Sequence, residues 1–194
     1  MMKDLPTHSG LSDEALMLRV KDGDHDAFSV LLDRYERQLF VFFLRQFGDE
    51  ESARDYVMDT FLRVYRAASR YEPKAKFSTY IYQIARNLAI NESRKRDFRR
   101  TESLDEMSDE SGMQFAGNQL NPAEEMEMRE RVTLVQEALR ELPEDQRTII
   151  ILVEYQELPY EKVAQIMGCS MGTVKSRMHR ARQKIREWME SREL

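Results

Sequence analysis

Apolar residues recur at helical spacing along almost the whole of this 194-residue chain, and this feature constrains its fold most strongly. Between about Asp26 and Phe47 they lie three or four residues apart, on one broad face. The same period returns in four later segments, at 49–68, 78–96, 132–142 and 159–185. Only seven Gly and five Pro interrupt the chain, so long helices are possible. The pattern predicts an all-α fold.

Capping residues mark where these helices begin. Four side chains precede a periodic segment and have an oxygen that accepts a hydrogen bond from a first-turn amide: Ser12, Asp49, Ser78 and Ser170. Pro143 and Pro159 fit the first position of a following helix. Gly48 follows the segment that ends at Phe47, where a glycine often terminates a helix. The sequence therefore predicts helix boundaries as well as helix faces.

An acidic segment interrupts the helical pattern in the middle of the chain. From Thr101 to Glu130 there are nine Asp or Glu and one basic residue, and "SDESGMQFAGNQLNP" has turn formers and no period. We therefore expect two small helical domains joined by a flexible acidic linker. The expected boundaries are a tail at 1–10, a first domain at 11–100, the linker at 101–125 and a second domain at 126–194.

A basic segment near the C-terminus contrasts with the formal net charge of −5. From Cys169 to Arg186 there are six Lys or Arg and no Asp or Glu. The helix expected at 159–167, the turn at Gly168 and the helix after Ser170 have the order of a helix–turn–helix. An isolated charge run is usually a solvated face. Here an apolar stripe backs the basic face, which favours binding in the DNA major groove.

The helix expected at 78–96 has a second polar face. Opposite its apolar stripe lie Tyr80, Gln83, Asn87, Asn91 and Arg94, with Tyr82 and Arg86 beside them. The segment ends in the basic cluster "SRKRDFRR". Aromatic rings, amides and arginines on one face suit unstacked bases and phosphates. The alternative is an ordinary wet face with half-buried tyrosine rings, and the second DNA-binding candidate in the same chain favours the functional interpretation.

Several other classes of protein are not expected. The apolar runs are too short to span a membrane, and "MMKDLPTHSG" lacks the apolar core of a secretory signal. Cys169 is the only cysteine, so an intrachain disulfide is impossible, which fits a reducing cytoplasm. His8, His25 and His179 show no metal-ligand spacing. With no nucleophile–base constellation and no glycine-rich phosphate loop, we expect neither an enzyme nor a bound cofactor.

Two long segments resemble a known family. The first, which contains "FSTYIYQIARN", resembles region 2 of the bacterial extracytoplasmic-function (ECF) sigma factors. The second, which contains "GTVKSRMHRAR", resembles their region 4. The two motifs are specific as a pair, and the resemblance covers nearly the whole chain except the tail and the linker.

The resemblance implies a promoter-specificity factor. Such a protein binds core RNA polymerase through the β′ clamp helices and the β flap, recognises −35 duplex and −10 promoter elements, and helps to open the DNA. It starts transcription of a dedicated, stress-responsive gene set. The resemblance also implies an anti-sigma factor as regulator, often membrane-bound, which would hold an otherwise cytoplasmic protein at the membrane.

The resemblance assigns roles to three sets of residues. The −35 set comprises Ser170, Thr173, Lys175, Ser176, Arg177, His179, Arg180 and Arg182. The −10 set, for binding and melting, comprises Phe77, Ser78, Thr79, Tyr80, Tyr82, Gln83, Arg86, Asn87, Asn91, Arg94, Lys95 and Arg96. The core polymerase set comprises Arg54, Asp55, Asp59, Arg63 and Arg66.

Three positions depart from the family pattern. Tyr80 stands where Trp is common and stacks less strongly, and Asn91 stands where Asp is frequent. His179 occupies a variable base-reading position, so no −35 sequence is transferred. Two rival interpretations are an ordinary DNA-binding regulator that uses only the second domain, and a protein-interaction adaptor. The first gives the 78–96 face no role, and the second leaves the basic helix unexplained.

Overall fold

The computed structural model describes residues 8, 10–102 and 122–192, and in these residues every regular element is helical. The N-terminal half consists of α1 (Asp13–Lys21), α2 (His25–Phe47), α3 (Glu50–Ala67), the short 3₁₀ turn η1 (Ala68–Arg70) and α4 (Phe77–Glu102). The C-terminal half consists of α5 (Pro122–Arg140), α6 (Glu144–Ile150), the π-helical turn η2 (Ile151–Tyr155), α7 (Tyr160–Met167) and α8 (Met171–Glu190). The predicted all-α class is confirmed.

The predicted linker falls mainly on residues 103–121, which lie outside the described residues. Helix α4 continues through 101–102 and α5 already begins at Pro122, so helix covers both margins of the 101–125 segment. In the described residues, no helix combines the length and the apolar character that crossing a membrane requires.

Side-chain caps begin most of the predicted helices. Ser12 accepts a hydrogen bond from the Ala15 amide at 3.2 Å, and Asp49 accepts one from the Ser52 amide at 2.7 Å. At the far end of the chain, Ser170 accepts one from the Thr173 amide. These bonds pair amides that would otherwise lack partners at the helix N-termini.

Two boundary predictions are wrong. Ser78 is not a cap, because α4 already begins at Phe77, whose amide donates to the Glu14 carboxylate of α1 at 2.9 Å. That hydrogen bond lowers the pKa of Glu14 below its ordinary value. Pro143 and Pro159 stand at the cap positions of α6 and α7, one residue before the expected place.

The N-terminal half packs α2 and α3 along each other, with α1 and α4 against them. Its core is built from the residues that the helical period predicted, among them Leu31, Phe42, Phe61 and Ile81. Gly48 ends α2 with a left-handed φ of 84°. Glycine adopts this left-handed region without strain, so it allows the chain to reverse direction at this position. After one further residue the chain enters α3.

The C-terminal half contains the predicted helix–turn–helix. Helix α7 ends at Gly168, whose φ of 63° makes the tight turn into α8. On α8 the side chains of Val174, Met178 and Ala181 are buried, as the spacing predicted, and Ile185 is partly buried. The apolar stripe therefore directs the opposite, basic face of α8 outward.

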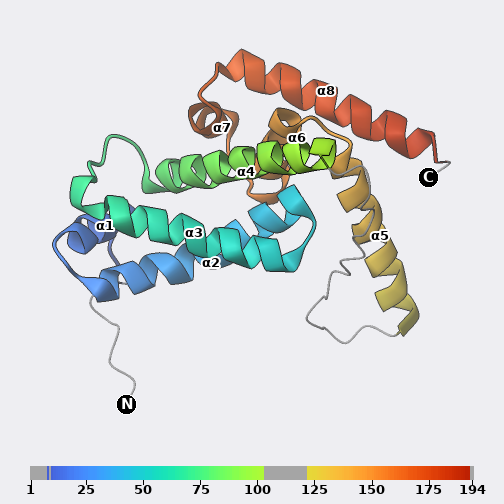
Figure 1. The fold of residues 1–194 in the computed structure, drawn as a ribbon. Helices are drawn as coiled ribbons and strands as arrows, with labels where there is room; N and C mark the ends of the chain where they lie inside the picture. The colour runs from blue at the N-terminus through green and yellow to red at the C-terminus, as the bar shows by residue number, and fades with distance from the viewer. Residues whose placement is uncertain (1–7, 9, 103–121, 193–194) are drawn as a thin grey trace.

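The two halves pack against each other and share one hydrophobic core cluster. Figure 1 shows α4 between the α2–α3 pair and the C-terminal helices, where it contacts α7 and α6. The end of α2 contacts α5 as well, because Gln136 donates to the Arg45 carbonyl at 3.0 Å. The sequence left the packing of the halves open, and the structure shows them closed on each other.

Candidate nucleic-acid interface

Helix α8 presents an exposed polar face of the composition that the sequence predicted. Lys175, Ser176, His179 and Arg180 are all exposed. The Ser170 hydroxyl lies 2.9 Å from that of Thr173, so both side chains belong to the cap of the helix. This arrangement leaves a free cationic and hydrogen-bonding surface at the first two turns of α8, which is the part of a recognition helix that contacts bases.

Two arginines of the predicted −35 set have acidic partners within the chain. Arg177 lies 3.0 Å from Asp145 of α6, and Arg182 lies 2.6 Å from Glu154 of η2. The hydrogen bond that Arg182 donates to the Glu154 carboxylate raises the pKa of Arg182 above its ordinary value. Both guanidinium groups lie beside the base-reading residues. After they release their carboxylate partners, they are in a position to contact DNA phosphates.

The polar face of α4 is only partly as expected. Gln83, Asn87, Asn91, Arg94 and Lys95 are exposed. The expectation that aromatic side chains share this exposed face is wrong for Tyr82. Phe77, Thr79 and Tyr82 are buried, with at most 2% of the side chain exposed, because α4 has protein on two sides.

Tyr80 is the aromatic side chain of the predicted −10 set that remains partly accessible. Its ring packs against Tyr71 and Phe77, at centroid distances of 5.5 and 6.1 Å, and burial raises its pKa. Ser78 is half-buried and lines a polar cavity of about 350 Å³ between the halves, together with Asp13, Arg34 and Lys162. Tyr80 thus forms the edge of an aromatic cluster and is held in place by it.

The C-terminal half makes polar contacts with part of the α4 face. Gln83 donates to the Gln165 carbonyl of α7 at 3.0 Å, and Arg86 lies 3.9 Å from Asp145. Arg96 is also engaged, at 3.2 Å from Glu92 and 3.5 Å from Asp49. Asn87, Asn91 and the charged residues at 94–95 are open to solvent, so one part of the face contacts the C-terminal half and the rest does not.

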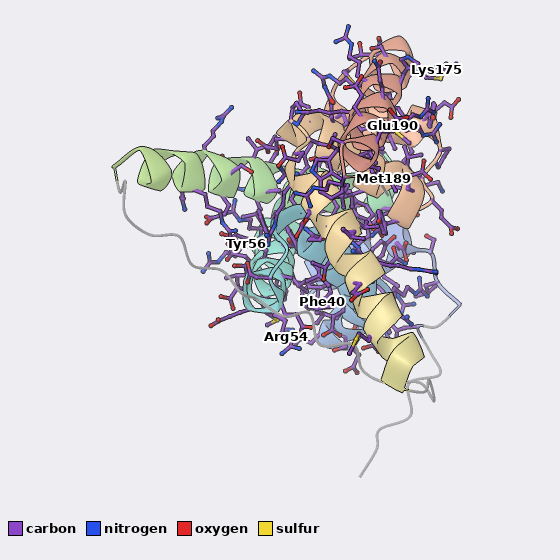
Figure 2. All side chains as sticks on the ribbon, turned by 90° about the vertical axis from the view of Figure 1, so that its right-hand side faces the viewer. Phe40, Arg54, Tyr56, Lys175, Met189 and Glu190 are labelled. Atoms are coloured by element: carbon purple, nitrogen blue, oxygen red, sulfur yellow. The ribbon has the colours of Figure 1, made fainter. Side chains whose placement is uncertain are left out.

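The charged residues predicted for polymerase binding lie on the outer face of α3. Arg54 pairs with Glu50 at 2.9 Å, and Arg63 lies 3.8 Å from Asp59. Asp55 and Arg66 are exposed. Figure 2 shows Arg54 on the side of the molecule away from Lys175 of α8, so the two surfaces are separate.

Sequence reasoning missed an apolar row on the same face of α3. Met58, Leu62 and Tyr65 are 66%, 43% and 42% exposed, although their side chains are large and apolar. Each lies one position after a core residue, Val57, Phe61 or Val64. The sequence therefore contains a second apolar stripe, beyond the one that a helix with a single buried face requires. An exposed apolar row among charges is typical of a protein-binding surface.

The C-terminal half contains a second feature that the sequence reasoning missed. An apolar groove of about 560 Å³ lies between α5, η2 and the end of α8. Its walls include Val135, Tyr155, Ile185, Trp188 and Met189. The signal was the return of apolar residues at 185–189, after the basic part of α8. Among the described residues, no three His, Cys, Asp or Glu side chains gather to hold a metal ion.

Comparison with known proteins matches both halves to family models. Residues 31–99 match sigma-70 region 2, and residues 133–185 match sigma-70 region 4. The chain is 34% identical over 179 residues to the ECF RNA polymerase sigma-E factor of Haemophilus influenzae, which covers 90% of this chain and 94% of that protein. It is 31% identical over 177 residues to the ECF RNA polymerase sigma factor SigW of Bacillus subtilis, covering 87% and 92%.

Solved structures show the same fold. The sigma factor RpoE of Bartonella quintana, in complex with the anti-sigma factor NepR, aligns with a TM-score of 0.63 and 26% identity, covering 84% of this chain and 96% of that one. CnrH, in complex with the cytosolic domain of CnrY, aligns with a TM-score of 0.67 and 24% identity, covering 92% and 97%. Both pairs of chains align over both halves.

Proposed function

Because the chain belongs to the sigma-70 family of RNA polymerase sigma factors, in its extracytoplasmic-function group, we propose that it directs core polymerase to two promoter elements. Helix α8 binds the −35 element as duplex, and α4 binds the −10 element and helps to open it. The observation that carries this proposal is the presence of two separate polar and cationic helix faces in one chain, on α8 and α4.

At the −35 element, Lys175, Ser176, His179 and Arg180 contact base edges in the major groove. They are exposed at the start of α8, where a recognition helix enters the groove. Arg177 and Arg182 contact phosphates on either side after leaving their carboxylate partners. The four base-reading residues are exposed at the start of α8, whereas Arg177 and Arg182 are ion-paired with carboxylates of α6 and η2 beside them.

At the −10 element, Asn87, Asn91 and Arg94 contact the separated strand, and Tyr80 offers an aromatic edge. Taking one base out of the stack costs a few kcal/mol, while stacking it on an aromatic ring returns roughly 1–3 kcal/mol. Because Tyr80 is half-buried and Phe77 and Tyr82 are in the core, this chain alone does not offset the cost of opening. Strand opening therefore requires the polymerase. The buried residues of the set act by holding α4 in place.

Two surfaces suit the polymerase. The apolar row of α3, flanked by Arg54, Asp55, Asp59, Arg63 and Arg66, binds the β′ clamp helices. The apolar groove between α5 and α8 binds a helix of the β flap, since its walls are long, apolar and open to solvent. Both assignments extend the resemblance to surfaces that the structure describes.

Regulation by an anti-sigma factor is the remaining part of the proposal. The Bartonella relative was solved with such a partner, and the same α3 row and C-terminal groove offer apolar area for one here. We propose that this partner, membrane-bound in some systems, withholds the protein from polymerase in the cytoplasm until a stress signal releases it. The gene set under its control is then a dedicated one.

A run-off transcription assay tests the function. Core polymerase is given a library of promoter fragments with and without the protein, and we expect discrete transcripts that require it. The Lys175→Ala/Arg180→Ala and Tyr80→Ala/Asn87→Ala proteins are expected to lose them. Gln183→Ala is the matched control, because Gln183 is exposed on α8 outside the proposed set and bonds only to Glu187 in the described structure.

The outcomes separate the alternatives. Dependent transcripts that survive both double substitutions would contradict the proposed faces. Specific duplex binding by the protein alone, without any dependent transcript, would favour a DNA-binding regulator that uses only the C-terminal half.

A further inference from the structure

The polar cavity of about 350 Å³ lies in the seam, the contact zone between the N-terminal and C-terminal halves. Helices α1, α2 and α4 line it from the N-terminal half, and Leu158 and Lys162 line it from the C-terminal half. This volume is at the lower end of the range for small-molecule sites and is many times that of one water molecule. The cavity is therefore large enough for a small metabolite.

The acidic side chains around the cavity are already engaged. Asp13 is the carboxylate of the wall: it accepts a hydrogen bond from Arg34 at 2.6 Å through Oδ1, and one from the Tyr35 hydroxyl at 2.5 Å through Oδ2. Burial, and then the bond to Asp13, raises the pKa of Tyr35, so this hydroxyl remains a donor. The neighbouring Glu14 accepts the Phe77 amide at 2.9 Å. Both carboxylates thus have partners within the N-terminal half.

Lys162 is the charged group of the wall that lacks such a partner. Its side chain is half-buried, and in the part of the chain that the structure describes its ammonium makes neither a hydrogen bond nor an ion pair. Burial lowers the pKa of Lys162, while the charges of Asp13 and Glu14 raise it and that of Lys76 lowers it. A charge that is partly removed from water without a bonded partner is unfavourable. An anion in the cavity would supply that partner.

The rest of the wall suits an oxyanion. Arg34 offsets the charge of Asp13, so the wall carries the net positive charge of Lys162. Ser78 lies in the first turn of the 26-residue helix α4, where the helix dipole is positive, and contributes a hydroxyl. Gln38 contributes an amide, and Leu158 offers apolar contact to a short carbon skeleton. Such a combination of few polar groups with one apolar side chain orients a small ligand.

We propose that this cavity binds a small organic anion, with its carboxylate or phosphate group on Lys162 and Arg34 and its carbon skeleton against Ser78, Gln38 and Leu158. The proposal goes beyond the proposed function, because it adds a site for a metabolite to a protein that we assign to DNA and polymerase. The ligand contacts both halves of the chain. By mass action, it therefore stabilises the folded protein in which the cavity exists.

Isothermal titration calorimetry on the full chain tests the site. The probes are inorganic phosphate, succinate and glycerol 3-phosphate. The first two distinguish a phosphate from a carboxylate group, and the third adds a hydroxylated carbon skeleton to the phosphate. We expect at least one probe to bind saturably at a single site.

Two substitutions in the cavity wall should weaken that binding at least about tenfold. Lys162→Met removes the ammonium and keeps a long side chain, so a charge-assisted hydrogen bond to the ligand is lost. Gln38→Glu is nearly isosteric and places a carboxylate opposite the anion. Because Gln38 is exposed, this second protein is expected to fold even where the first does not.

Two control proteins keep the cavity intact. Lys184→Met removes the same charge from the same half, but Lys184 lies on α8 and donates to the Glu141 carbonyl. The Lys175→Ala/Arg180→Ala protein removes two cations from the proposed DNA-binding face of α8, to which a phosphate could also be attracted. We expect both proteins to bind the probe as the wild type does.

Thermal melts followed by circular dichroism give a second readout. The probe should raise the melting temperature of the wild-type and control proteins, and it should leave that of the Lys162→Met and Gln38→Glu proteins unchanged. The same melts show whether each variant is folded.

Three results would overturn the proposal. One is the absence of saturable binding of every probe to the wild-type protein, and another is wild-type affinity in both cavity variants. The third is loss of binding in the Lys175→Ala/Arg180→Ala protein, which would place the anion on α8. These measurements use neither DNA nor polymerase, so their failure leaves the proposed function intact, and a failed run-off assay leaves the anion site intact.

Discussion

Replacing Tyr82 with Phe tests whether this side chain joins the two halves or faces DNA. The ring is in the core, with 1% of the side chain exposed, and the hydroxyl donates to Gln156 in the other half at 2.5 Å. The substitution keeps the ring and removes only the hydroxyl. The side-chain oxygen of Gln156 then loses the hydrogen bond that it accepts from Tyr82, while the side-chain amide of Gln156 still donates to the Gln38 carbonyl.

The magnitude follows from the lost bond. Losing the hydrogen bond to this partly buried acceptor costs about 0.5–1.5 kcal/mol. Because the acceptor belongs to the C-terminal half, this cost applies to the closed arrangement, and the open fraction should rise roughly two- to tenfold. Tyr82→Ala removes the ring as well and should cost about 3–5 kcal/mol of folding free energy through the cavity that it leaves.

Urea unfolding measures the stability of the variants, and energy transfer between the halves measures closure. Tyr35→Phe is the matched control, because the Tyr35 hydroxyl donates to Asp13 at 2.5 Å within the N-terminal half. It should lower stability without opening the seam. A Tyr82→Phe protein with wild-type stability and wild-type energy transfer would refute the reasoning, and so would a Tyr82→Ala protein that folds normally and fails only in DNA opening.

Three further predictions follow from single contacts. Gly168→Ala places a side chain at φ 63° in the helix–turn–helix and should cost about 1 kcal/mol in urea unfolding, with weaker −35 duplex binding. The pKa of Glu14 is lowered because its carboxylate accepts a hydrogen bond from the Phe77 amide. Its contribution to stability is therefore present above the unfolded pKa of 4.5 and is lost as the pH falls through the folded pKa. The Glu14→Gln protein should therefore lose less stability than wild type between neutral and acidic pH in parallel urea titrations. Met58→Ser with Leu62→Ser should change the unfolding free energy by no more than about 0.5 kcal/mol, because both side chains are exposed, yet weaken core polymerase binding at least tenfold in a fluorescence titration.

The α4 helix shows how far the sequence reasoning reached. Its apolar stripe, with Ile81, Ala85 and Leu88, is buried as the period predicted. The prediction of an exposed aromatic side chain at Tyr82 is wrong, because α7 and α6 of the other half pack against α4 and Gln156, just after η2, accepts the Tyr82 hydroxyl. The helical period predicts one buried face of a helix. A helix that lies between two layers has a second buried face, which depends on a segment far away in the sequence.

Helix boundaries show the same division. Ser12, Asp49 and Ser170 cap as predicted, because the donor and the acceptor lie three residues apart. The start of α4 was placed wrongly at Ser78, because its first amide bonds to Glu14, which lies 63 residues earlier. The assigned roles of individual residues at the DNA and polymerase surfaces stay predictions.

The sequence by itself determined the all-α class, the capped helices, the helix–turn–helix with its turn at Gly168, and the family. These depend on period, caps and motifs, which act over a few residues. Only the tertiary structure decided that the halves close on each other, that Tyr82 is in the seam and that Asp145 lies between Arg86 and Arg177. The reason is physical: such contacts join residues far apart in the chain, and their geometry is set by how whole helices pack, which no local pattern encodes.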